Sequence, residues 1–314
     1  MQMETTCPHV VASDGDWMGR MRFHQSWYRR NRLKLDPGPY GNHLLPKHGD
    51  EGRNFINDDI FAFAKSRLAQ GQGAVEKNRL LRNMLSRQPL CFNLFAPLAL
   101  NLPDATDFLR ALLPNRSQDA RALRVSVEYA PPSETHLNDR TAFDAFIEYE
   151  LPDLQKGFVG IEAKLTEPFS AKSYPFERYA KWGQKADSWW SDHEGRAFGD
   201  KQYNQLWRDH LLAFSMLRQP QPQYAEGYLA VLYHDLDANC PDAIRSYRGQ
   251  LTPQGEATLL EWPLGKVVHT LANATNADRA WLAALKERYI DVALSDADYA
   301  AYQRPGKRRR KKNE

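Results

Sequence analysis

The pattern of hydrophobic and polar positions changes its period along the chain and so separates helical from extended segments. Residues 76–86 (EKNRLLRNMLS) carry their leucines and methionine on one helical stripe, which predicts an amphipathic helix. The N-cap types Asn57 and Asp58 precede a second helical run, IFAFAKSRLA. An apolar helix is expected over residues 90–100. The chain is therefore expected to be largely helical before its strands begin.

Three segments with a period of two come next. Residues 123–129 (LRVSVEY) and 141–150 (TAFDAFIEYE) alternate apolar and polar side chains, as half-buried strands do. Residues 157–166 (GFVGIEAKLT) have the composition of a third strand. The links between these segments are short or rich in Pro, Ser and Asn, so we expect successive strands to pair as an antiparallel meander.

The rest of the chain returns to helices and single strands. A long apolar stripe predicts a helix over residues 201–217, and the apolar run 226–234 predicts a buried strand of the same sheet. A short strand is expected near residues 258–262, with helices near 265–272 and 277–293. This order predicts the α/β class, in the form of an α-β-α sandwich whose central mixed sheet contains the meander.

Composition divides the chain into three parts. We expect an N-terminal arm at residues 1–52, a main domain at 53–303 and a disordered basic tail at 304–314 (RPGKRRRKKNE). The tail holds the net positive charge and serves either solubility or a non-specific contact with phosphates. Within the arm, residues 17–34 interleave aromatics with arginines. This pattern favours an amphipathic helix that lays its aromatics on the core, with a grip on nucleic acid as the alternative.

Overall composition narrows the class of protein and of metal site. The 314 residues are 42% hydrophobic and include 8 Trp, 14 Tyr and 14 Phe, enough for a large core. We see no signal peptide and no membrane span, so we expect a cytoplasmic protein. Cys7, Cys91 and Cys240 fit neither a disulfide framework nor a zinc site, and the histidines lack ligand spacing. Any bound metal is therefore expected to have oxygen ligands.

One group of charged residues lies inside the predicted strands. Alternate residues of a strand share a face, so Glu162 and Lys164 project to one side of the third strand. Asp144 lies on the preceding strand, where an antiparallel hairpin would place it beside them. Two adjacent carboxylates suit Mg²⁺, which takes one or two carboxylates and completes its shell with water and phosphate oxygens. A nearby ammonium group would assist attack by water at a phosphate.

Asp144 followed by Glu162-Ala163-Lys164 resembles the PD-(D/E)XK signature of restriction-endonuclease-like nucleases. The resemblance implies that Asp144, Glu162 and the main-chain carbonyl of Ala163 bind Mg²⁺, with Mn²⁺ as an alternative, and that Lys164 is the catalytic lysine. It also implies DNA as substrate, with RNA not excluded. The residue before Asp144 is Phe143 rather than proline, at a position that the superfamily keeps loosely.

The resemblance extends beyond this signature to most of residues 80–212. The runs LLRNMLSRQPLCFNLF, RTAFDAFIEY, GIEAKLTEPFS and YNQLWRDHLL are similar to an uncharacterised bacterial family of proposed restriction endonucleases. A restriction or other defence role is implied by that likeness alone. A homodimer is also an open expectation, because enzymes that cut both strands often dimerise.

Several further residues are secondary candidates. Gln205 lies on the helix after the third strand, where some relatives place a glutamine that orients water or substrate, and a polar helix face is the alternative. Glu128 and Glu76 could each add a carboxylate, although a structural role for Glu128 and a helix-dipole role for Glu76 are the alternatives. The remaining candidates are Tyr203 and Arg208 beside Gln205, Lys172 and Tyr174 as phosphate contacts, and His210 and His234, expected to be satisfied polar residues near the core.

Two other functions compete with nuclease activity. The first is a catalytically inactive nucleic-acid-binding protein with the same fold. The second is a structural or partner-binding protein in which the Glu162 and Lys164 pair has no chemistry. In that case Asp144 and Glu162 should lie on opposite faces of the sheet. The sequence leaves open the recognised sequence, endonuclease or exonuclease action, and whether Glu76 or Glu128 joins the metal site.

Overall fold

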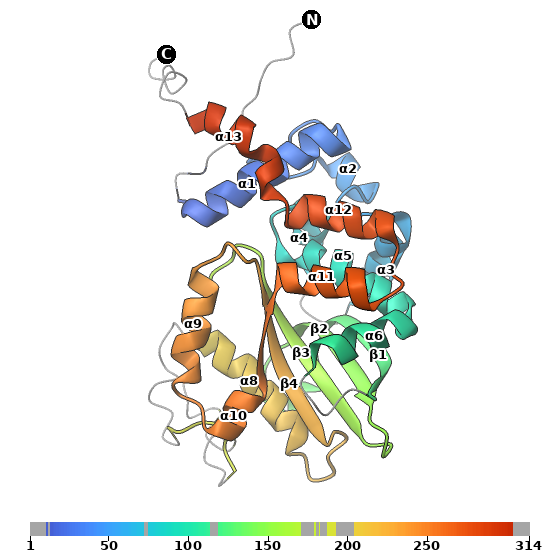
Figure 1. The fold of residues 1–314 in the computed structure, drawn as a ribbon, viewed down its shortest axis with the longest axis vertical. Coiled ribbons are helices and arrows are strands. Elements are labelled where there is room, and N and C mark those ends of the chain that lie inside the picture. The colour runs from blue at the N-terminus through green and yellow to red at the C-terminus, as the bar shows by residue number, and fades with distance from the viewer. Residues whose placement is uncertain are drawn as a thin grey trace, which may run out of the picture.

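A single twisted sheet forms the centre of the computed structural model, which describes residues 11, 13–71, 75–113, 119–170, 179, 182, 187–192 and 204–303. The sheet has five strands in the order β1-β2-β3-β4-β5. These are β1 (Arg121–Tyr129), β2 (Phe143–Glu150), β3 (Lys156–Lys164), β4 (Glu226–Tyr233) and β5 (Leu259–Pro263). Figure 1 shows the strands running side by side through the middle of the molecule.

The pairing of the strands confirms the predicted meander. β1, β2 and β3 pair in succession and antiparallel, while β4 adds to β3 in parallel and β5 adds to β4 in parallel. Parallel neighbours need a crossover, and the intervening segments supply helices for it. The mixed sheet is thus the one expected from the order of periods along the sequence.

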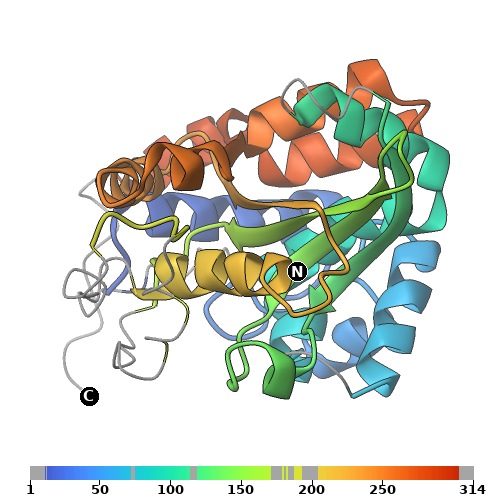
Figure 2. The same ribbon diagram turned by 90° about the horizontal axis from the view of Figure 1, so that it is seen from below.

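Helices cover both faces of the sheet and complete the predicted sandwich (Figures 1 and 2). One face packs against a core formed with α3 (Asp58–Ala69), α4 (Lys77–Arg82), α5 (Arg87–Leu100), α6 (Leu102–Leu112), α11 (Leu264–Ala274) and α12 (Arg279–Tyr289). The other face packs against α8 (Asn204–Leu217) and α9 (Asn239–Arg248), with α10 (Pro253–Ala257) following α9. Ile161, Ala163 and Leu165 of β3 are fully buried in the first core, as the alternation predicted.

The helix expected over residues 76–86 is shorter than predicted. α4 ends at Arg82, because Asn83 adopts an extended conformation with ψ 101°. The side chain of Ser86 then accepts a hydrogen bond from the main-chain N–H of Gln88 and caps a new helix, α5. The prediction of one continuous helix to residue 86 was wrong at its end. The break matters because it makes Arg87 the first residue of α5 and points that helix end at the sheet.

The N-terminal region packs against the C-terminal helices (Figure 1). It contains α1 (Asp16–Tyr28), a π-helix (Arg29–Leu33) and α2 (Pro46–Asp50). Helix α1 contacts α12, the 3₁₀ turn Val292–Ser295 and α13 (Asp296–Gln303), whereas α2 contacts α4. Another 3₁₀ turn covers Ser133–Thr135. Tryptophan, phenylalanine and methionine side chains of α1 contact the core or the C-terminal helices.

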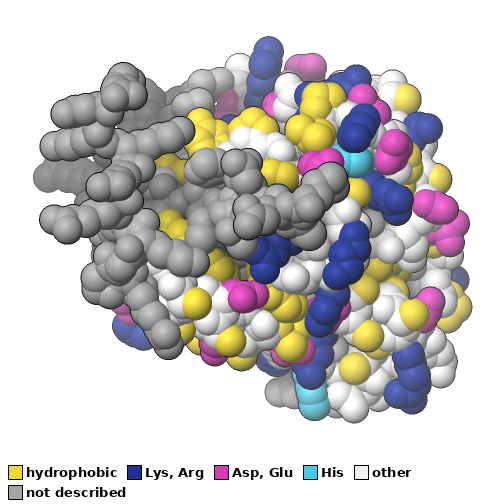
Figure 3. Space-filling view, turned by 90° about the horizontal axis from the view of Figure 1, so that it is seen from above, with side chains coloured by type: hydrophobic (Ala, Val, Ile, Leu, Met, Phe, Trp, Pro, Cys, Tyr) yellow, Lys and Arg dark blue, Asp and Glu magenta, His cyan; other side chains and the backbone are white. Residues whose placement is uncertain are grey.

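The arginines of the N-terminal region are largely engaged in ion pairs. Arg20 pairs with Asp296 at 2.6 Å, and Arg32 pairs with Glu287. Figure 3 shows basic and acidic side chains intermixed on the upper face of the molecule. The aromatics of residues 17–34 thus contact the core as the amphipathic-helix interpretation expected, but Arg20, Arg22 and Arg29 are largely buried rather than in water. The limits of the arm and domain stay predictions, and the tail at 304–314 lies outside the described residues. Within the described ranges, no helix is both long and apolar enough to span a membrane.

Candidate active site

Three acidic side chains form a row across the antiparallel strands. Paired residues on either side place Glu128 of β1 opposite Asp144 of β2, and the pairing of β2 with β3 places Asp144 opposite Glu162. All three are buried, with exposed fractions of 3%, 4% and 2%. Like charges directly opposite one another destabilise a sheet, so this row requires cations nearby. Structural demands alone give no reason for such a row.

Lys164 supplies one of these cations. It follows Glu162 on the same face of β3, is only 1% exposed, and places its Nζ 2.8 Å from Glu162 Oε1. The structure therefore brings Asp144, Glu162 and Lys164 together at one end of the sheet, on the face that α8 covers. The arrangement in which Asp144 and Glu162 lie on opposite faces is not observed.

Gln205 on the first turn of α8 holds this group in place. Its Nε2 donates a hydrogen bond of 2.6 Å to Glu162 Oε1. Its Oε1 accepts from Lys164 Nζ at 3.0 Å and from the main-chain N–H of Ser170 at 2.6 Å. Because the amide bonds both members of the ion pair, it fixes the position of the ammonium group relative to the carboxylate. The sequence-based candidate on this helix thus lies inside the site.

Asp144 has a different partner, which the sequence did not indicate. The Nε of Arg87 donates to both carboxylate oxygens of Asp144, at 3.0 and 2.8 Å. The main-chain N–H of Ala163 donates to Asp144 Oδ2 at 2.9 Å. The N–H of Arg87 itself donates to Glu167 Oε1 at 2.9 Å, which anchors the start of α5 beside the site. The only signal in the sequence was Ser86, an N-cap type that could have placed a helix start there.

Burial and neighbouring charges set the protonation of the two central carboxyls in opposite directions. Burial, followed by the charge of Glu162, raises the pKa of Asp144 well above its usual value. Burial opposes ionisation of Glu162 too, but the charges of Lys164 and Arg87 outweigh it and lower the pKa of Glu162. The negative charge of Asp144 in turn raises the pKa of Arg87. The site without metal is thus a coupled group of two carboxyls and two cations.

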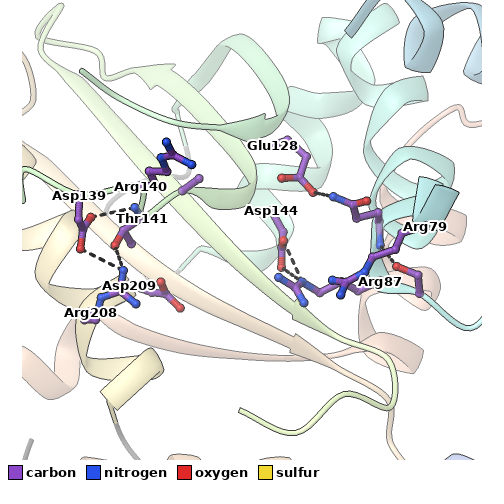
Figure 4. A pocket seen from close by; sticks show the side chains of 12 residues that line it. Arg79, Arg87, Glu128, Asp139, Arg140, Thr141, Asp144, Arg208 and Asp209 are labelled. Atoms are coloured by element: carbon purple, nitrogen blue, oxygen red, sulfur yellow. Dashed lines mark hydrogen bonds and ion pairs between the residues drawn. The ribbon is translucent and has the colours of Figure 1, made fainter. Parts of the chain in front are cut away.

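A cavity of about 450 Å³ opens beside Asp144 and contains several charged side chains (Figure 4). Its lining includes Arg79, Arg87, Arg140 and Arg208, together with Glu128, Asp139, Asp144 and Asp209. Arg208 is committed to Asp139, with an Nη2 to Oδ2 distance of 3.0 Å. Arg79 and Arg140 are exposed, and in the described part of the chain their side chains form no hydrogen bond or ion pair. The cavity therefore offers two uncommitted guanidinium groups next to the acidic row.

Asp209, one turn after Gln205 on α8, is a further acidic residue that the sequence analysis missed. It is 4% exposed, and its Oδ2 has no hydrogen-bond partner in the part of the chain that the structure describes. Burial, followed by the charge of Glu162, raises the pKa of Asp209 well above its usual value. The spacing of four residues from Gln205 on one helix could have indicated its side of the sheet.

The other sequence candidates fall outside the central group. Glu76 is exposed and caps α4, accepting from the N–H groups of Asn78 and Arg79. Glu128 accepts a hydrogen bond of 2.9 Å from Gln88 Nε2. His210 and His234 are buried, and burial lowers their pKa values to about 3 and about 4. Both ring nitrogens of His210 are hydrogen-bonded as expected, whereas Nε2 of His234 has no hydrogen-bond partner among the described residues. Lys172, Tyr174 and Tyr203 lie outside the described residues.

The donor set suits a hard divalent cation. Asp144 and Glu162 lie opposite each other on neighbouring strands, and both are buried where a cation would offset their repulsion. Within the described ranges, no three side chains of the types His, Cys, Asp and Glu are grouped to hold a metal. A site here would rely on two carboxylates, main-chain oxygen and water, which is the pattern magnesium accepts.

Comparison with known proteins gives one match. A family model described as PD-(D/E)XK nuclease superfamily matches residues 12–291, which is most of the chain. Neither a curated protein nor a solved structure matches. The matched range contains every element that forms the site, from α5 through β1, β2 and β3 to α8.

Proposed function

The chain belongs to the PD-(D/E)XK nuclease superfamily, whose members generally hydrolyse nucleic acids with divalent metal ions, and from this premise we propose that it is a Mg²⁺-dependent deoxyribonuclease. The observation that carries the proposal is the convergence of Asp144, Glu162 and Lys164 at one end of the sheet. A catalytically inactive binding protein would have no need to keep two carboxyls and an ammonium group buried together.

In this proposal Asp144, Glu162 and the carbonyl of Ala163 hold the metal, with Mn²⁺ as an alternative ion. The N–H of Ala163 already points to Asp144, and paired residues of a strand direct their N–H and C=O to the same neighbour. The carbonyl therefore faces the same side as the carboxylates. When bound, the ion would supply Lewis-acid polarisation of the phosphate and a lowered pKa for bound water.

The chain's own residues then orient the reacting groups. Lys164 holds a positive charge beside Glu162, where an attacking water and the phosphate oxygens would gain negative charge. Gln205 keeps the ammonium group at a fixed position by bonding both Lys164 and Glu162. Its role in the proposal is to position Lys164 rather than to contact the phosphate.

The charges of the two cavities beside the site support approach of the substrate from the side of Asp144. The cavity beside Asp144 contains four arginines and four acidic residues, so its formal charges balance. A second cavity of about 570 Å³ borders Lys164, and its lining includes four acidic residues: Asp16, Glu167, Asp237 and Asp242. A polyanion is therefore repelled less by the first cavity than by the second, and Arg79 and Arg140 of the first cavity are uncommitted and can contact it. The family likeness adds three further parts to the proposal, which are cleavage within a duplex, a restriction or defence role, and a homodimer.

Cleavage of plasmid DNA with and without Mg²⁺ tests the proposal. Wild-type protein should cleave in Mg²⁺ and not in EDTA, and Asp144→Asn and Lys164→Met should each lose about 100-fold or more of the rate. Lys156→Met is the matched control, because Lys156 lies on the same strand but pairs with Glu148 at 3.0 Å, away from the site. Its rate should equal that of the wild type.

Single-stranded DNA and RNA of the same sequence, tested in parallel, identify the nucleic acid that is cut. Metal-independent cleavage, or equal rates for the wild type and Lys164→Met, would remove the assignment. Binding of DNA with no cleavage in Mg²⁺ or Mn²⁺ would favour the inactive binding protein.

A further inference from the structure

The side chain of Arg87 makes only part of the contacts that a guanidinium group can form. Its Nε bonds both oxygens of Asp144, while its two terminal amino groups have no hydrogen bond to any described residue. The side chain is 27% exposed and lines the cavity that also contains Arg79 and Arg140 (Figure 4). An arginine placed only to neutralise a buried aspartate would be expected to use its paired amino groups as well.

Arg87 occupies the carboxylate that the proposed metal needs. Both oxygens of Asp144 accept from its Nε, and Oδ2 also accepts from the N–H of Ala163. A divalent ion at Asp144 and Glu162 would meet a fixed positive charge within a few ångströms, in a site with little water to screen it. Full coordination and the present ion pair therefore exclude each other.

The surroundings allow the guanidinium group to leave without unfolding the site. The main chain of Arg87 is held by its bond to Glu167 and by the start of α5, so only side-chain torsions need to change. The cavity of about 450 Å³ gives the group a place to go. Once there, its donors would face the position of a nucleic-acid phosphate, together with the uncommitted Arg79 and Arg140.

We infer that Arg87 is an exchangeable counter-ion, which neutralises Asp144 in the metal-free protein and, when a divalent ion replaces it there, turns into the cavity to bind a substrate phosphate. The inference rests on the proposed metal-dependent nuclease function and adds a residue that the family signature does not contain. It makes Arg87 oppose metal binding and favour nucleic-acid binding, two effects of opposite sign from one side chain.

Mn²⁺ titration of Arg87→Met, followed by electron paramagnetic resonance of the free ion, tests the first effect. Removing the positive charge of Arg87 strengthens the binding of both a proton and Mn²⁺ to the carboxylates. The repulsion removed is twice as large for the doubly charged Mn²⁺ as for a proton, so the Mn²⁺ affinity should rise by about 10-fold. Arg87→Lys keeps the charge and should change the metal affinity by much less.

Binding of a short DNA duplex in Ca²⁺ tests the second effect, because Arg87 leaves Asp144 only when a divalent ion replaces it. Arg87→Met should bind DNA more weakly than the wild type. With Ca²⁺ present, which avoids cleavage, the slope of log affinity against log salt should be smaller by about 1, as expected for one lost phosphate contact. Arg124→Met is the matched control, because Arg124 pairs with Glu148 at 2.9 Å on the same sheet, outside the site, and should alter neither Mn²⁺ nor DNA affinity.

Unchanged or weaker Mn²⁺ binding by Arg87→Met would overturn the inference, provided that its thermal unfolding matches that of the wild type. If Arg87→Met does not fold, Arg87→Lys decides, because tighter Mn²⁺ binding by this variant would contradict a role for charge. Asp144→Asn separates the two proposals. If Asp144→Asn loses both Mn²⁺ binding and cleavage while Arg87→Met gains no Mn²⁺ affinity, the exchange is refuted and the nuclease assignment stays intact.

Discussion

Two aspartates that line the same cavity should respond in opposite ways to replacement by asparagine. Asp209 is buried with an oxygen that lacks a partner among the described residues, and burial followed by the charge of Glu162 raises its pKa well above the usual value. Asp139 is partly buried, but hydrogen bonds from Tyr179 and Thr141, with the charge of Arg208, outweigh burial and lower its pKa. The perturbations are Asp209→Asn and Asp139→Asn.

The sign for each residue follows from proton linkage. A carboxyl whose pKa is raised by folding binds more protons in the native state, so its contribution to stability is greatest in acid and declines as the pH rises above the unfolded pKa. Relative to Asp209→Asn, the wild type should lose up to about 1.4 kcal/mol of unfolding free energy per pH unit in that window. The lowered pKa of Asp139 works the other way, and its stabilisation is lost as the pH falls through the folded pKa.

The hydrogen bonds of Asp139 set the size of the second effect. It accepts from Tyr179 at 2.7 Å, from Arg208 at 3.0 Å and from the N–H of Thr141 at 2.8 Å. Hydrogen bonds to a charged group contribute about 1.5–3 kcal/mol, so Asp139→Asn should cost about this amount at neutral pH and less in acid. Asp209→Asn should instead match or exceed the wild-type stability at neutral pH and lose this advantage in acid.

Urea unfolding followed by circular dichroism, in EDTA from about pH 3 to pH 8, measures both effects, because the stabilisation by Asp139 is lost only below the ordinary pKa of an aspartate. Equal slopes of the unfolding free energy against urea concentration for the three proteins would show that the unfolded states are comparable. A loss of more than about 1 kcal/mol in Asp209→Asn at neutral pH, or a difference from the wild type that does not vary with pH, would refute the reasoning. Either result would mean that the buried carboxyl is satisfied as an anion in the native state.

Two further predictions concern catalysis and binding. Gln205→Leu removes the bridge between Glu162 and Lys164 but keeps their direct ion pair. The cleavage rate should therefore fall by about 10- to 100-fold while DNA affinity in EDTA is unchanged. An equal loss of DNA affinity and cleavage rate would assign Gln205 to substrate binding instead. Arg140→Gln should reduce the slope of log DNA affinity against log salt by about 1. The control Arg245→Gln breaks an exposed ion pair with Asp242 on α9 and should leave this slope unchanged. Equal slopes for both variants would show that the cavity does not receive a phosphate.

The sequence by itself determined the strands and the side on which their residues lie. A period of two fixes the face of every residue in a strand, so Glu162 and Lys164 had to share one side while Ile161 and Ala163 entered the core. The short link between β2 and β3 also determined their antiparallel pairing, and with it the proximity of Asp144 to Glu162. These features depend on contacts within a hairpin, which local patterns encode.

Only the tertiary structure decided which groups surround this pair. Glu128 joins the acidic row through the register of β1 with β2, and a shift of one residue would have turned it away. Arg87 is 57 residues from Asp144, and their contact depends on where α4 breaks and how α5 docks. Gln205 and Asp209 reach the site because α8 packs on the face opposite α5, and such docking is set by the fit of whole surfaces, which no local periodicity specifies.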